Sequence, residues 1–203
     1  MFRSLLFILS LSFGSLALGS TTTNNILVLG DSISAAYGIN TDSGWVSLLS
    51  LKIAQKKKPY QVINASISGD TTINGLKRLP ALLKKYEPAI VIIELGGNDG
   101  LRGLSLKTIE NNLKQIIELS QKSGAKTILA GMKIPPNYGR RYTRTFYKIY
   151  NDLSKNHQTG FIPFLLEGIG DKKELMQKDG LHPAQGAQKM IMEIVWEKLV
   201  LIL

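Results

Sequence analysis

The sequence predicts an α/β protein, a three-layer α/β/α sandwich around a parallel sheet of about five strands. Short runs rich in β-branched residues alternate with longer segments of helical period, and this alternation is typical of parallel sheets with helices on both faces. Polar, glycine-containing turns follow the first three of these runs. Because ligands bind outside the carboxyl ends of parallel strands, we expect those turns to gather at one edge and to form a site there.

Four short runs are the predicted strands. They occupy residues 26–29, 61–63, 90–93 and 127–129. The turns that follow the first three begin at Gly30, Asn64 and Gly96.

Two helices can be placed from the spacing of their apolar residues. Between Ser105 and Gly124, apolar side chains recur at three- and four-residue steps, with Ser105 as the expected N-cap and Gly124 as a left-handed end. A last helix is expected to begin at Pro183, where the missing N–H of proline costs nothing, with His182 as its N-cap. Its buried face should comprise Ala187, Met190, Ile191, Ile194 and Val195.

Residues 1–19 are predicted to be a secretory signal peptide. Arg3 precedes an apolar run of 14 residues from Leu5 to Leu18, which is shorter than the roughly 20 residues of a membrane span. Cleavage near Gly19 would leave residues 20–203 as a single exported domain, and an uncleaved membrane anchor is the alternative.

The composition limits the classes of site and partner. The chain contains no cysteine, which excludes disulfide frameworks and thiolate zinc sites. Its net charge is +10, with basic runs at 56–58, 84–85 and 140–144; these favour anionic surfaces or substrates, or form a solvated basic face. No nucleic-acid-binding module is present, so we expect no nucleic-acid partner.

The polar turns contain the residue types of a Ser-His-Asp hydrolase. Ser32 directly follows the first predicted strand, His182 is one of two histidines, and Asp179 lies three residues before it. In such a triad histidine deprotonates serine, and aspartate holds the imidazole in the required tautomer. His157 is expected at an exposed helix end, where a histidine favours the helix dipole. A helix cap is the alternative role for Ser32, and a cap or surface position for His182.

Donors for the oxyanion of a tetrahedral intermediate are also available. Asn98 lies in a Gly-Gly-Asn-Asp turn, where missing Cβ atoms permit close approach. The backbone N–H groups of Gly69 and Ser32 could complete the oxyanion hole. Taken alone, the Gly-Gly-Asn-Asp string is equally typical of an ordinary turn.

Four blocks together resemble the SGNH, or GDSL-type, hydrolase family, in the same order and with matching spacing. The resemblance extends over about residues 25–196, and two departures are Ile33, where leucine is usual, and Ala36, where relatives tend to carry glycine. The blocks are residues 30–34, 64–70, 97–99 and 179–183.

The resemblance implies the flavodoxin-like SGNH hydrolase fold, with Ser32, Asp179 and His182 as catalytic triad and Ser32, Gly69 and Asn98 as oxyanion donors. It implies a serine hydrolase of acyl esters and thioesters, with acyl-CoA thioesterase, arylesterase and lysophospholipase activities. No metal or organic cofactor is expected. A periplasmic monomer acting on fatty acyl-CoA or lysophospholipid is expected, and its basic charge is compatible with transient contact with a membrane surface.

Two alternatives to this function remain at the level of sequence. One keeps the triad and assigns carbohydrate O-deacetylation. The other is a non-catalytic periplasmic module whose glycine turns hold an anion by backbone N–H groups.

Apolar residues near the turns are candidates for the walls of an acyl pocket, although packing against the sheet explains the leucines equally well. Arg140, Arg141 and Arg144 could hold an anionic head group or a CoA phosphate, or could be a solvated face. The candidate wall residues are Leu76, Leu79, Pro80, Ile134, Pro135 and Tyr138.

Overall fold

The computed structural model describes residues 24–203, so the predicted signal peptide lies outside the described residues. Five parallel strands form one sheet in the order β2-β1-β3-β4-β5. The strands are β1 (Asn24–Gly30), β2 (Tyr60–Asn64), β3 (Ile90–Glu94), β4 (Lys126–Ala130) and β5 (Gly160–Ile162).

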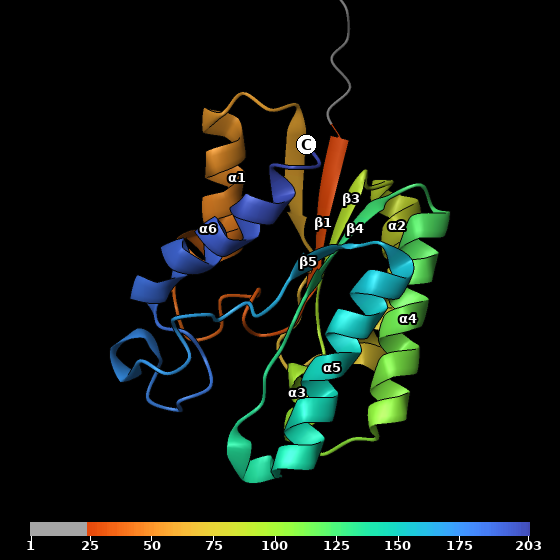
Figure 1. The fold of residues 1–203 in the computed structure, drawn as a ribbon. Helices are drawn as coiled ribbons and strands as arrows, with labels where there is room; N and C mark the ends of the chain where they lie inside the picture. The colour runs from red at the N-terminus through yellow and green to blue at the C-terminus, as the bar shows by residue number, and fades with distance from the viewer. Residues whose placement is uncertain (1–23) are drawn as a thin grey trace, which may run out of the picture.

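Helices cover both faces of this sheet (Figure 1), which confirms the predicted three-layer α/β/α sandwich. One face carries α1 (Trp45–Gln55) and α6 (Gln188–Leu199), which pack against each other. The other face carries α2 (Thr72–Tyr86), α4 (Leu106–Lys122) and α5 (Arg140–His157). None of the helices within residues 24–203 has both the length and the apolarity that crossing a bilayer requires.

The central strands explain why the apolar runs could be recognised as strands. All five residues of β3 are buried, as are the last five of β1, because helices cover these strands on both sides. The largest fully buried side chains are Trp45, Tyr150 and Phe146, which come from α1 and α5. Truncating any of them to alanine would cost about 3–5 kcal/mol, so both helical layers are firmly attached to the sheet.

The helix predicted between Ser105 and Gly124 is confirmed as α4. Ser105 is the N-cap residue, although its side chain makes no capping hydrogen bond. Gly124 has a φ of 90°, and glycine adopts this left-handed conformation without the strain that a Cβ would cause.

The predicted start of the last helix at Pro183 is wrong. Pro183 pairs with Met176 in an isolated antiparallel bridge, and the N–H of Ala184 donates to the carbonyl oxygen of Leu175 at 2.7 Å. These bonds hold the backbone outside a helix, so a 3-10 turn follows at Gln185–Ala187 and α6 begins only at Gln188. His182 therefore lies in a loop and is not an N-cap.

The buried face of α6 is also rotated from the predicted one. Met190 is 38% exposed, whereas Met192 is buried beside Ile191 and Val195. Met190 and Met192 flank Ile191, and either could lie at the edge of the apolar face that Ile191 and Val195 define. The sequence alone therefore did not decide which methionine is buried.

Every strand points the same way and ends at the lower end of the sheet in Figure 1. The turn after β1, the turn between β2 and α2, and the short helix α3 (Gly97–Leu101) all lie there. Three of the predicted site segments therefore meet at one edge.

Candidate active site

Three predicted catalytic side chains contact one another in a chain. The Oγ of Ser32 lies 2.8 Å from Nε2 of His182, and Nδ1 of His182 lies 2.6 Å from Oδ2 of Asp179. Ser32 and His182 are 150 positions apart in sequence, and they meet because the turn after β1 and the loop before α6 converge at the sheet edge. The hydroxyl is therefore placed to pass a proton to the imidazole.

Asp179 is fixed by its own loop as well as by the imidazole. Its Oδ1 accepts the backbone N–H groups of Leu181 at 2.9 Å and His182 at 3.0 Å. The hydrogen bond from the His182 N–H is the largest cause that lowers the pKa of Asp179 to about 2; burial opposes it, and the His182 side chain and the Leu181 N–H lower the pKa further. The carboxylate is consequently ionised at any pH where an imidazole could act as a base.

Tyr37 and Gln177 hold His182 from the side. The Tyr37 ring lies 4.5 Å from the imidazole, centroid to centroid. The backbone N–H of Gln177 donates to the carbonyl oxygen of His182 at 2.7 Å. The side-chain Nε2 of Gln177 donates to the carbonyl oxygen of Tyr37, also at 2.7 Å. Neither residue was predicted, because no motif marks a side chain that acts by bridging two loops.

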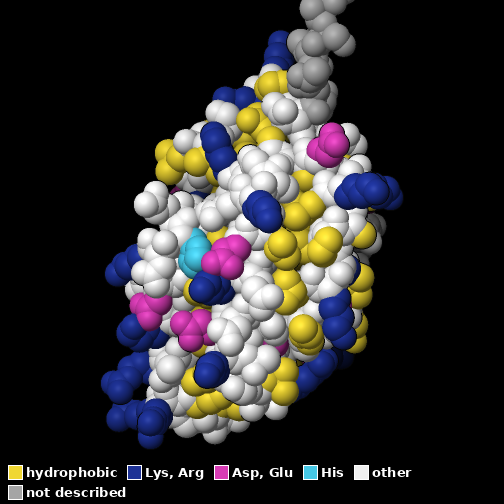
Figure 2. All heavy atoms as spheres, turned by 90° about the vertical axis from the view of Figure 1, so that its right-hand side faces the viewer, with side chains coloured by type: hydrophobic (Ala, Val, Ile, Leu, Met, Phe, Trp, Pro, Cys, Tyr) yellow, Lys and Arg dark blue, Asp and Glu magenta, His cyan; other side chains and the backbone are white. Residues whose placement is uncertain are grey.

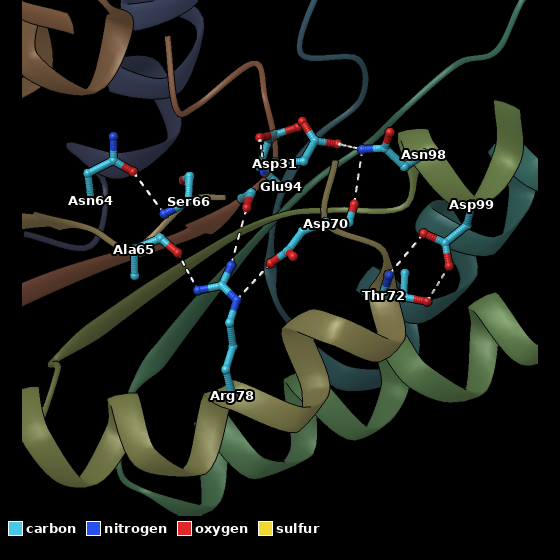
Figure 3. Close-up of polar contacts among 11 residues, drawn as sticks. Asp31, Asn64, Ala65, Ser66, Asp70, Thr72, Arg78, Glu94, Asn98 and Asp99 are labelled. Carbon is cyan, nitrogen blue, oxygen red and sulfur yellow. Dashed lines mark hydrogen bonds and ion pairs between the residues drawn. The ribbon is translucent and has the colours of Figure 1, made fainter. Parts of the chain in front are cut away.

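The predicted oxyanion donors surround the same turn. Asn98 lies in the first turn of α3, and its Nδ2 donates to Oδ2 of Asp31 at 3.1 Å and to the carbonyl oxygen of Asp70 at 3.0 Å (Figure 3). Gly69 adopts a φ of 82° in the turn before α2. Within residues 24–203, the backbone N–H groups of Ser32 and Gly69 make no hydrogen bond. These two donors are therefore free to bind an anionic oxygen.

A buried carboxyl pair lies directly behind Ser32. Asp31 is 2% exposed and Glu94, the last residue of β3, is 0% exposed. Oε2 of Glu94 accepts hydrogen bonds from Ser34 Oγ at 2.5 Å and from the Asp31 N–H at 3.2 Å. Its Oε1 has no partner among the described residues.

Burial dominates the protonation of this pair. It raises the pKa of Asp31 to about 6, against the hydrogen bond that Asp31 accepts from the Ile33 N–H. Burial, followed by the charge of Asp31, raises the pKa of Glu94 well above its usual value. The pair therefore tends to retain a proton. Sequence reasoning missed both residues, because the sequence does not show that β1 and β3 are neighbours, which places Glu94 at the end of β3 beside Asp31.

Arg78 ties the neighbouring turns together from α2. Its guanidinium donates to Oδ2 of Asp70 at 2.7 Å, to the carbonyl oxygen of Ala65, and to that of Gly30 at 3.3 Å (Figure 3). One side chain thus braces the turns after β1 and β2, which carry Ser32 and Gly69. Such charge-assisted bonds are among the stronger hydrogen bonds of proteins.

An apolar hollow of about 140 Å³ opens beside Ser32 and His182. Ile134 and Pro135, two of the predicted wall residues, line it together with Ser32, Asn98 and His182. Further apolar walls come from Leu101, Met132, Phe164, Leu166 and Leu181.

The other predicted wall residues lie elsewhere. Leu79 is fully buried in the core, Leu76 packs against that core from the same helix, and Pro80 is exposed on α2. Tyr138 donates its hydroxyl to the carbonyl oxygen of Leu101 at 2.9 Å and lines a neighbouring hollow. The α2 residues face the sheet or solvent because that helix packs along the sheet and away from this hollow.

Ala36 occupies a strained position in the turn that carries Ser32. Its φ is 59°, in the left-handed region that costs a residue with a Cβ roughly 1–2 kcal/mol relative to the ordinary helical region. Its side chain is buried. The turn keeps this conformation with alanine present.

Comparison with known proteins shows one family. The profile of the GDSL-like lipase/acylhydrolase family matches residues 28–189. The chain is 49% identical to esterase TesA of Pseudomonas aeruginosa, over 86% of this chain and 87% of that protein. It is 46% identical to an arylesterase of Vibrio mimicus, over 93% of this chain and 94% of that protein. It is 41% identical to thioesterase 1/protease 1/lysophospholipase L1 of Escherichia coli (strain K12), over 96% and 89%.

Solved structures agree with this result. The crystal structure of TesA superposes with a TM-score of 0.87 at 48% identity, covering 89% of this chain and all of that one. The psychrotrophic esterase EstA from Pseudoalteromonas sp., inhibited by monoethylphosphonate, gives a TM-score of 0.84 at 43% identity, over 87% and 97%.

Proposed function

This chain belongs to the GDSL-like lipase/acylhydrolase family, and we propose that Ser32, His182 and Asp179 are its catalytic triad. With them the chain acts as a serine hydrolase of acyl esters and thioesters. One observation carries the assignment. The Oγ of Ser32 lies within hydrogen-bond distance of an imidazole whose other nitrogen contacts an ionised carboxylate. That arrangement meets the geometric requirement for a general base acting on a serine.

In the proposed acylation step, Ser32 Oγ attacks the substrate carbonyl carbon while Nε2 of His182 takes the hydroxyl proton. The imidazolium formed is stabilised by Asp179, whose carboxylate stays ionised. Collapse of the tetrahedral intermediate breaks the bond to the leaving oxygen or sulfur, and His182 returns the proton to that atom. The acyl group is then esterified to Ser32.

The negative oxygen of the intermediate needs donors that are already in place. The N–H groups of Ser32 and Gly69 would donate to it, and Asn98 would turn an amide hydrogen toward it from Asp31 or Asp70. In deacylation a water molecule attacks the acyl-enzyme, His182 again acting as the base. The free acid leaves and the Ser32 hydroxyl is restored.

The character of the hollow favours an acyl chain over a sugar. Its walls beside the triad are largely aliphatic and aromatic, which suits hydrocarbon, whereas a sugar would require many polar partners. Fatty acyl-CoA and lysophospholipid are therefore our proposed substrates. We also propose a monomer that contacts membranes transiently, which size-exclusion chromatography and vesicle sedimentation would test.

The proposed location is the periplasm, after removal of residues 1–19. The support for it is the basic residue and the apolar run of that segment, which are typical of signal peptides. Determining the amino terminus of the exported protein tests this, and a protein still beginning at Met1 would contradict it.

Covalent trapping tests the nucleophile. A fluorophosphonate should form a bond to Ser32 Oγ, as inhibition of the related EstA by a phosphonate suggests. Mass spectrometry of tryptic peptides should find the adduct on Ser32, and Ser32→Ala should abolish both labelling and hydrolysis of p-nitrophenyl esters. Ser47→Ala is the matched control, because Ser47 is a half-buried residue on α1 whose hydroxyl donates to the backbone carbonyl oxygen of Thr41. Labelling that persists in Ser32→Ala would refute the assignment.

A further inference from the structure

A second hollow, of about 750 Å³, lies next to the catalytic one. The two share Lys133 and Ile134 in their linings. Its remaining walls come largely from the first turns of α5, including Arg140, Arg141 and Arg144. We call it the basic hollow. A substrate held at Ser32 could therefore extend from one hollow into the other across Ile134.

Three of the four positive charges of the basic hollow have no ion-pair partner among the described residues. Its lining contains four cationic residues and no acidic one. Lys133 is paired with Glu167 at 3.2 Å, whereas among residues 24–203 none of the three arginines forms an ion pair. Figure 2 shows Lys and Arg side chains gathered at the lower left of the face that α2, α4 and α5 form.

The position of these arginines is unfavourable for the helix itself. No acidic residue occupies the first turn of α5, and cations near a helix N-terminus cost a few tenths of a kcal/mol or more each. Local rules of this kind are most often broken at functional sites. A solvated basic face would gain nothing from concentrating charge at this end of the helix.

We propose that the basic hollow binds the phosphate carried by the leaving alcohol or thiol of the substrate. The inference rests on the proposed function, because both substrate classes named above release a phosphate-bearing group, glycerophosphate or CoA. A guanidinium donates two parallel hydrogen bonds to phosphate oxygens. Three unpaired guanidinium groups around one hollow match a group that carries one to two negative charges on several oxygens.

The test compares substrates whose leaving group carries phosphate with substrates whose leaving group carries none. Decanoyl-CoA is paired with S-decanoyl-N-acetylcysteamine, and 1-decanoylglycerol 3-phosphate with 1-decanoylglycerol. The variant is the triple substitution Arg140→Gln, Arg141→Gln and Arg144→Gln, which should fold because all three side chains are exposed. The control is Lys56→Gln, Lys57→Gln and Lys58→Gln, an equal loss of charge on exposed residues that directly follow α1.

We expect the arginine variant to raise the KM ratio of phosphate-bearing to phosphate-free substrate at least 10-fold, with kcat little changed, because phosphate binding contributes equally to ground and transition states. The lysine variant should leave the ratio within twofold. A change confined to the CoA pair, or to the glycerol pair, supports the site and identifies which source it serves.

An unchanged ratio in both pairs would overturn the proposal, as would an equal change in the lysine variant. Failure of the proposed function has a different signature. In that case the unmodified enzyme would hydrolyse neither member of either pair, including the phosphate-free esters.

Discussion

Glu94 combines complete burial with an ionisable group and no ion-pair partner among the described residues. Its neighbours include Asp31, Ser34 and the buried Tyr150, whose pKa is itself raised by burial. Burying a charged carboxylate without a cation is costly. We infer that Glu94 holds a proton in the folded protein, which leaves the carboxylate charge on Asp31 beside Asn98.

This inference sets the pH dependence of stability. The pKa of Asp31 rises from 3.8 to about 6 on folding, and that of Glu94 rises well above its usual value. Between about pH 4 and pH 7 the folded state therefore binds more protons than the unfolded state, so these groups lower the free energy of unfolding as pH rises. Asp179, whose pKa is lowered to about 2, has the opposite effect. Its contribution to the free energy of unfolding is complete above about pH 4 and is lost as the pH falls toward 2.

Replacing Glu94 by Gln should remove part of this pH dependence. Glutamine has no proton to lose, and its amide could donate to Asp31. Between pH 5 and pH 8, the free energy of unfolding of Glu94→Gln should rise relative to the unmodified protein by about 1 kcal/mol or more, as measured by urea unfolding. The exposed Glu197→Gln serves as control. Parallel pH curves for Glu94→Gln and the unmodified protein would show that Glu94 does not titrate in this way.

Asn98→Ala should separate catalysis from folding. Loss of one oxyanion donor typically lowers kcat by 10²–10³-fold, about 3–4 kcal/mol. The free energy of unfolding should fall by only about 1 kcal/mol, since the substitution removes two hydrogen bonds at a half-buried site. Asn25→Ala is the control, because that amide bonds the carbonyl oxygen of Tyr86 at the amino end of β1. If kcat falls no more in Asn98→Ala than in Asn25→Ala, the amide is only structural.

At the scale of elements, the loop of residues 175–184 carries His182, the proposed catalytic base, outside the α-helices. Backbone bonds fold it onto itself, from Gln177 to His182 and from Ala184 to Leu175. The side chain of Gln177 then joins it to the Ser32 turn through Tyr37 and also reaches the carbonyl oxygen of Pro183 at 3.2 Å. The distance between Ser32 and His182 therefore depends on this glutamine.

Gln177→Ala should loosen that connection. We expect kcat/KM for p-nitrophenyl esters to fall about 10-fold, because small errors in the position of a base are costly, and stability to fall by about 1 kcal/mol. Gln121→Ala is the matched control, since Gln121 on α4 also donates two bonds from Nε2, to the hydroxyl of Thr127 on β4 and to the carbonyl oxygen of His157 at the end of α5. Equal kinetic losses in both variants would rule out a positioning role for Gln177.

For the whole molecule, the sheet and its layers were predictable because four strands contain runs rich in β-branched and apolar residues, and the core buries those of β1, β3 and β4. β5 was not located, since its three residues form a short edge strand beginning with glycine. The convergence of Ser32 and Asn98 was expected from their positions after strands, and that of Asp179 and His182 with Ser32 was expected from the residue types of a Ser-His-Asp triad; their catalytic roles stay predictions.

Other parts of the site could not be read from the chain. The bridging contacts of Gln177 depend on how two distant loops meet, and the buried pairing of Asp31 with Glu94 depends on β1 lying beside β3; residue spacing encodes neither. The wall residues on α2 were misplaced for a related reason. Leu79 has the periodicity of a core residue, and only the packing of α2 shows which way it faces.

The 150-residue separation of Ser32 from His182 also affects when hydrolysis can begin. Ser32 is made early in synthesis and His182 near its end, so in the proposed mechanism a nascent or threaded chain holds the nucleophile without its base. Turnover by the proposed triad can start only after the carboxyl-terminal segment has docked. If the chain is exported as proposed, its unfolded precursor would be harmless to acyl thioesters on the side of the membrane where it is made.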